Sequence, residues 1–97
     1  MTELERRIAE IQADMNSINV DKARAEKINE DLMNQVNILD LLIGAKLTRG
    51  EDISELLSKK DGLIKELEIN NDRLENLLDR LKEVMIKSMN LLGNIMF

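Results

Sequence analysis

The stretch VNILDLLIGAKLTRGEDI, residues 36–53, decides the architecture of this chain. Its first half is strongly apolar, and only Asn37 and Asp40 interrupt the run from Val36 to Ile43. Its second half lies near the middle of the 97 residues and combines features that end one helix and start another. A turn here would make the chain a hairpin, whereas an uninterrupted helix would make it a rod.

Residues 48–52 carry the signals of a turn. Lys46 and Arg49 place positive charge in the last turn of the first helix, where the helix dipole favours it. Gly50 suits the left-handed residue that commonly follows a helix. Asp52 can cap the next helix, with Glu55 three residues later as in a capping box. The predicted turn residues are Thr48, Arg49, Gly50, Glu51 and Asp52.

The first half of the chain has the spacing of a coiled-coil seam, because an apolar residue recurs every three or four positions. Continuing this register places Lys22, Ala25 and Asn29 at seam positions. Asn29 is then either part of a solvated helical stretch or a buried polar residue that fixes the register. The predicted interface residues of the first helix are Leu4, Ile8, Ile11, Met15, Ile18, Leu32, Val36, Leu39 and Ile43.

The second half repeats this amphipathic pattern with a wider apolar face. The predicted interface residues are Ile53, Leu57, Ile64, Leu67, Leu74, Leu78, Leu81, Met85, Leu92 and Ile95. Beside this stripe lie Leu56, Leu63, Leu77, Val84 and Leu91. A two-stranded seam cannot cover so wide a face, whereas a three- or four-helix bundle can. A candidate surface for a further partner comprises Ile38, Leu41, Met89, Met96 and Phe97.

These patterns predict an all-α fold with one helical domain over residues 1–97, made of helix 3–48, turn 49–52 and helix 53–96. The two helices form a long antiparallel coiled-coil hairpin that associates into a helical bundle. The alternative is a continuous parallel coiled-coil rod, because the seam keeps one register from Leu4 to Ile95. A parallel rod would stack Lys46 and Lys60 against their own copies, which favours the hairpin.

The composition excludes several kinds of partner. The net charge is −5 without a basic cluster, so nucleic acid is not an expected partner. No apolar run approaches the roughly 20 residues of a membrane span, and no signal peptide is visible. We therefore expect a soluble, intracellular protein, with the cytoplasm as its compartment. With Phe97 as the one aromatic residue, a compact core within one chain is hard to fill, and a second chain is expected.

The sequence predicts no enzyme. It has neither His nor Cys, so the usual zinc ligands and the commonest proton-transfer and nucleophilic groups are missing. Carboxylates four residues apart, such as Glu75 and Asp79, fit solvated helix faces, and we expect no catalytic, cofactor or metal site. The expected function is self-association, as an assembly or adaptor protein that binds itself or another helical protein. The alternatives are a small acidic chaperone that holds an amphipathic helix of a client, or an elongated spacer or filament rod.

Overall fold

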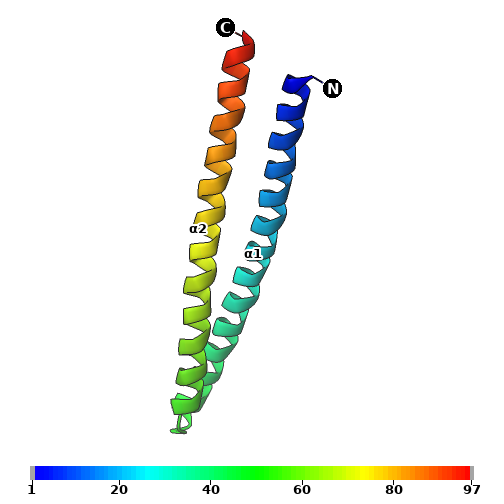
Figure 1. Cartoon of the computed structure of the whole chain (residues 1–97). Coiled ribbons are helices and arrows are strands. Elements are labelled where there is room, and N and C mark those ends of the chain that lie inside the picture. Colours follow the sequence, from blue (N-terminus) through cyan, green and yellow to red (C-terminus); the bar gives the residue numbers. More distant parts are fainter. Residues whose placement is uncertain (1, 97) are drawn as a thin grey trace. The chain divides into compact units, whose positions relative to one another are not determined.

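The chain is a two-helix hairpin (Figure 1). The computed structural model describes residues 2–96, and the side chains of residues 2–94. Helix α1 spans Glu3–Thr48 and helix α2 spans Ser54–Met96. The two helices pack against each other, which confirms the predicted all-α hairpin and shows that the alternative of one continuous helix is wrong. Association of hairpins into a bundle stays a prediction.

Helix α1 ends at a glycine in a left-handed conformation. Gly50 has a φ of 70°, which is favourable only for a residue without a Cβ. Its N–H donates to the carbonyl of Leu47 at 3.1 Å, and the N–H of Glu51 donates to the carbonyl of Lys46 at 2.9 Å. This pair of hydrogen bonds is a Schellman motif, and it satisfies two carbonyls that the end of α1 leaves without helical partners.

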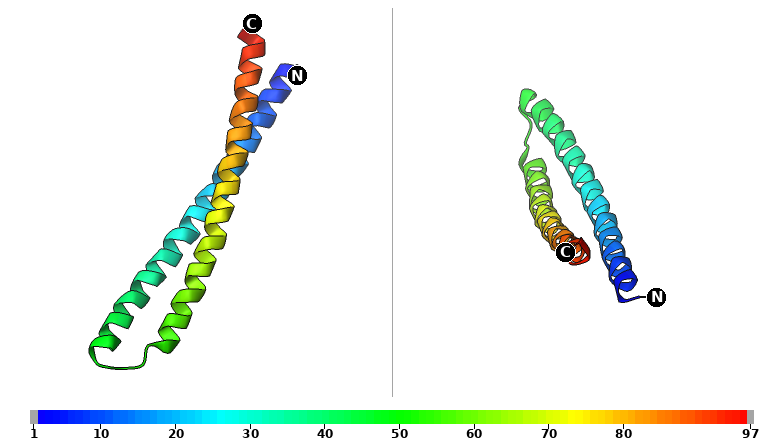
Figure 2. Two further views of the ribbon diagram at one scale, coloured as in Figure 1. Left: turned by 90° about the vertical axis from the view of Figure 1, so that its left-hand side faces the viewer. Right: turned by 90° about the horizontal axis from the view of Figure 1, so that it is seen from above.

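Helix α2 begins with an acidic residue just before it. The carboxylate of Asp52 accepts hydrogen bonds from the N–H of Ser54 at 3.0 Å and from its hydroxyl at 2.6 Å. Ile53 precedes the helix, and its carbonyl accepts the first helical hydrogen bond, from Leu57. Asp52 therefore satisfies a free N–H of the first turn, while Glu55 pairs with Lys59 instead of completing a capping box. Figure 2 shows the short connection from two further directions.

The described hairpin divides into two compact units. The turn unit holds residues 25–73, and the terminal unit joins the segment of α1 up to Arg24 to the segment of α2 from Leu74 onward. In each unit a segment of α1 packs on a segment of α2. Each unit is considered by itself below, and the expectation of one domain stays a prediction.

The core lies along the seam between the helices. In the turn unit, Leu32 and Val36 of α1 form a buried cluster with Leu67 of α2, against which Leu63 packs. In the terminal unit, the most buried apolar residues are Ile18 of α1 and Leu77 and Val84 of α2. The other interface residues predicted in α1 are half-buried, except for two near its start that are 39% exposed. The half-buried residues are Ile11, Met15, Leu39 and Ile43, and the exposed ones are Leu4 and Ile8.

Polar residues interrupt the seam of the turn unit at two levels. Lys60 is half-buried, and its Nζ lies 2.6 Å from a carboxylate oxygen of Asp40 on α1. Asn70 is 3% exposed, and its Nδ2 donates to the carbonyl oxygen of Ala25 at 2.8 Å. The Oδ1 atoms of Asn29 and Asn70 are buried without a hydrogen-bond partner among the described residues. Asn29 is therefore not in a solvated stretch, because its amide oxygen is enclosed by the seam.

Candidate functional site

Helix α2 carries two parallel rows of mainly apolar residues, and each row has one member every seven positions. The inner row, which faces α1, consists of Leu56, Leu63, Asn70, Leu77, Val84 and Leu91, all buried or half-buried. The outer row follows each of these by one residue and consists of Leu57, Ile64, Asn71, Leu78, Met85 and Leu92. Its five apolar members are between 37% and 54% exposed. A third row, the shared row, lies between the first two and consists of Ile53, Lys60, Leu67, Leu74, Leu81 and Ser88.

The α1–α2 seam therefore uses a different side of α2 than the sequence predicts. The predicted stripe combined the shared row with the outer row, and the structure packs the shared row and the inner row on α1. Ile53, Leu67, Leu74 and Leu81 lie in the observed seam, whereas the predicted residues Leu57, Ile64, Leu78, Met85 and Leu92 lie beside it. Their contact with another helix stays a prediction. The side chain of Ile95 lies outside the described residues.

In the terminal unit an apolar groove of ≈340 Å³ opens next to Ser88. Ser88 occupies a seam position, and its side chain is too short to fill the space that a leucine would fill there. Ile8, Ile11 and Met15 line the groove from α1, with Leu91 and Leu92 from α2. Since Gln12 and Leu92 are both in the lining, the groove lies on the side of the seam that carries the outer row.

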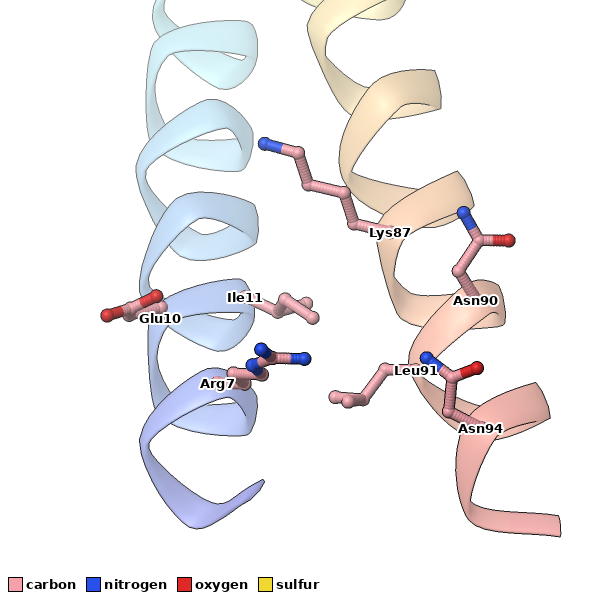
Figure 3. A pocket seen from close by; sticks show the side chains of 7 residues that line it. All are labelled: Arg7, Glu10, Ile11, Lys87, Asn90, Leu91 and Asn94. Atoms are coloured by element: carbon pink, nitrogen blue, oxygen red, sulfur yellow. The ribbon is translucent and has the colours of Figure 1, made fainter. Parts of the chain in front are cut away.

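The opposite side of the terminal unit is polar. A second groove of ≈260 Å³ is lined there by Arg7, Glu10, Ile11, Lys87, Asn90, Leu91 and Asn94. Figure 3 shows Lys87 reaching from α2 toward α1 and Arg7 pointing toward α2, while the carboxylate of Glu10 points away from α2. Arg7 already binds Glu3 at 3.2 Å. The terminal unit thus has an apolar side, which carries the outer row, and a charged side.

The residues that the sequence suggests for a partner surface do not form one patch. Ile38 is 58% exposed and lines a groove of ≈410 Å³ in the turn unit, together with Leu39, Gly62 and Leu63. Leu41 is 76% exposed and does not line this groove. Met89 lies in the terminal unit and is 68% exposed. Phe97 and the side chain of Met96 lie outside the described residues.

Electrostatic interactions on the hairpin are mostly short-range pairs on exposed helix faces. Hydrogen bonds from Arg6 and Arg7 hold the pKa of Glu3 below its ordinary value. A hydrogen bond to Asp31 raises the pKa of Lys27. Such exposed pairs contribute little to stability. Within the described part of the chain, no three carboxylates gather closely enough to hold a metal ion.

Neither helix, over the residues that the structure describes, contains a stretch long and apolar enough to cross a membrane. Comparison with known proteins places the chain in no family. No family model, no curated protein and no solved structure matches its sequence or its fold.

Proposed function

We propose that this chain is a non-enzymatic coiled-coil assembly protein that binds a second copy of itself through the outer row of α2. The observation that carries the proposal is the exposure of this row. Leu57 and Ile64 in the turn unit, and Leu78, Met85 and Leu92 in the terminal unit, repeat at the heptad spacing of a helix interface. A helix of a two-helix hairpin needs only one narrow stripe, and α2 has more.

The spacing of the outer row supports a helical partner. Residues seven apart lie on one side of a helix, so within each unit these side chains form a line that another helix can pack along. Together with the inner and shared rows, they give α2 the three-position apolar face that is typical of helices in bundles. Moving each half-exposed leucine or methionine out of water contributes roughly 1 kcal/mol, less than the ~1.5–3 kcal/mol of full burial.

The ionisable groups support a role without catalysis. Glu3, Lys27 and Asp52, whose pKa values depart from the ordinary ones, are exposed, and hydrogen bonds with neighbours in sequence are the main cause of each shift. Catalytic acids and bases usually owe their shifted pKa values to burial in a cleft. An assembly role requires no such group.

A client helix of another protein is a second candidate occupant. The groove beside Ser88 favours it, because its apolar lining includes Met15, and the methionine side chain adapts to partners of different shape. Such a chain would act as an adaptor or a small chaperone. The two functions differ in one measurable respect, since only self-association requires the isolated chain to be larger than a monomer.

The test is sedimentation equilibrium of the isolated chain over a hundredfold range of concentration. We expect a mass that rises with concentration to that of two or more chains. A triple variant of the outer row, Leu78→Gln, Met85→Gln and Leu92→Gln, should weaken association at least tenfold. The matched control carries Val20→Gln, Ile69→Gln and Ile86→Gln. These three residues are 50–62% exposed and belong neither to the seam nor to the outer row.

The control should associate as the wild-type chain does. A wild-type chain that stays monomeric over the whole range would refute self-association and leave the client helix as the occupant to examine. A chain that associates equally well with and without the outer-row changes would show that another surface mediates the contact.

A further inference from the structure

The inner and outer rows of α2 carry nearly the same side chains in the same order. At every level of the heptad, the residue that faces α1 is followed by one of the same kind. The six pairs are Leu56 and Leu57, Leu63 and Ile64, Asn70 and Asn71, Leu77 and Leu78, Val84 and Met85, and Leu91 and Leu92. Even the one polar member of the inner row, Asn70, is duplicated. The outer row therefore offers α1 the same sequence of side chains as the inner row.

We propose that α2 can pack on α1 in two positions. By turning about its own axis, α2 brings either the inner row or the outer row against α1. The shared row lies between the two and stays in the seam in both positions. The rotation required is roughly 50°, half of the ~100° that separates successive residues of an α-helix. This inference does not rest on self-association, because both positions belong to a single hairpin.

The two positions are close in energy because the side chains that they exchange are close in chemistry. Four of the six pairs exchange a leucine for a leucine or an isoleucine, so the apolar surface removed from water is nearly equal. Val84 and Met85 differ in shape and size but are both apolar. Packed cores tend to have discrete alternative arrangements instead of deforming continuously.

The contact of Asn70 with Ala25 offsets part of the cost of burying an amide in the observed position, while the Oδ1 of the same amide is buried without a partner among the described residues. Ala25 is 1% exposed, and its small side chain lets the amide of Asn70 reach the backbone carbonyl of α1 at 2.8 Å. In this position Asn71 is exposed on the outer row, where its amide is solvated at no cost. A buried asparagine at one seam position is known to fix the register of helix pairs. Each row thus carries one asparagine at this level, and replacing the asparagine of one row by leucine favours the burial of that row.

The experiment uses the reactivity of single cysteine thiols to measure which row is buried. Because the wild-type chain has no cysteine, each introduced thiol is the only one in its variant. Leu77→Cys reports on the inner row and Leu78→Cys on the outer row, since these positions are 6% and 42% exposed. Each reporter is placed in three backgrounds: wild type, Asn70→Leu and Asn71→Leu. The quantity compared is the ratio of the reaction rate at position 78 to that at position 77.

The Asn71→Leu background should lower this ratio by about tenfold or more, because it makes the outer row fully apolar while the inner row keeps its asparagine. The Asn70→Leu background is the matched control, with the same change one residue earlier. It should leave the ratio unchanged or raise it. The rates are compared at concentrations at which sedimentation shows a monomer, because coverage of position 78 by a second copy would grow with concentration.

The inference is overturned if Asn71→Leu leaves the ratio within twofold of the wild-type value. It is also overturned if both thiols become reactive together, because that outcome reports a loosened hairpin and not an exchange of rows. Helix content from circular dichroism distinguishes a loosened hairpin from a rotated one, since rotation leaves the content unchanged.

Discussion

The adjacent residues Leu77 and Leu78 should respond very differently to the same substitution. Leu77 is 6% exposed in the seam of the terminal unit, and Leu78 is 42% exposed on the outer row. Replacing either by alanine changes the composition and the helix propensity of the chain identically. Any difference in the free energy of unfolding therefore comes from where each side chain lies.

The expected magnitudes follow from burial. Leu77→Ala removes a buried side chain and leaves a cavity beside α1, which costs about 2–3 kcal/mol, near the low end of measured leucine-to-alanine changes because a two-helix seam can partly relax. Leu78→Ala leaves no cavity and loses only part of its transfer free energy, about 1 kcal/mol. The two variants should thus differ by roughly 1–2 kcal/mol in stability.

The assay is urea unfolding followed by circular dichroism, at a concentration at which all chains are monomeric, so that loss of an outer-row contact with a second copy does not contribute. The slope of the free energy with urea should be the same for both variants, and the midpoints should differ. Equal destabilisation by the two substitutions, or a larger effect of Leu78→Ala, would refute the assignment of Leu77 to the seam.

The two other predictions concern the connection between the helices. Gly50→Ala should destabilise the hairpin by about 1 kcal/mol in thermal or urea unfolding, because φ is 70° there, whereas Gly44→Ala inside α1, with open space around its Cα, should stabilise it by a similar amount. Destabilisation by both changes would contradict this account of the turn. Hydrogen bonds from the hydroxyl and then the N–H of Ser54 lower the pKa of Asp52. The contribution of this carboxylate to the stability of the fold is therefore present above the ordinary pKa of 3.8, and it is lost as the pH falls through the lowered pKa. A carboxyl titration of Asp52 by NMR in wild type and Ser54→Ala should show a higher pKa in the variant, and an unchanged pKa would exclude this cause.

The position of the turn could be predicted because its signals are local. The left-handed conformation of Gly50 and the acidic residue Asp52 before the second helix depend on chemistry within a few residues. Helix type could be predicted for the same reason, since apolar spacing of three and four appears along both halves. The role of Glu55 could not be predicted, because its side chain can interact either with the backbone or with Lys59, and the spacing of the residues does not decide between them.

The side of α2 that faces α1 could not be predicted from spacing. Leu56 and Leu57 satisfy the same heptad period equally well, and so does every other pair along the two rows. The choice depends on packing between distant parts of the chain, which in the turn unit includes the hydrogen bond from Asn70 to Ala25. A small residue at position 25 was visible in the sequence, but its partner on α2 was not.

A surface for a partner was equally difficult to locate. Ile38, Leu41 and Met89 are exposed, as expected of apolar residues outside a seam, but exposure alone does not bring them together. The apolar lining of the groove beside Ser88, which includes Ile8, Ile11 and Met15, was predicted as interface, but the groove itself was not, because the short side chain of Ser88 leaves the space open. A small polar residue at a seam position is the feature that could have indicated it.

The Schellman turn at Gly50 also bears on the order in which the hairpin folds. In a hairpin the contacts nearest the turn join residues that are close in sequence, such as Asp40 and Lys60, and their loops are the least costly to close. Contacts near the chain ends, such as those around the groove of Ile11 and Leu91, enclose most of the chain. We therefore expect folding to start at the turn and to proceed outward, because each closed layer shortens the loop that the next layer must close.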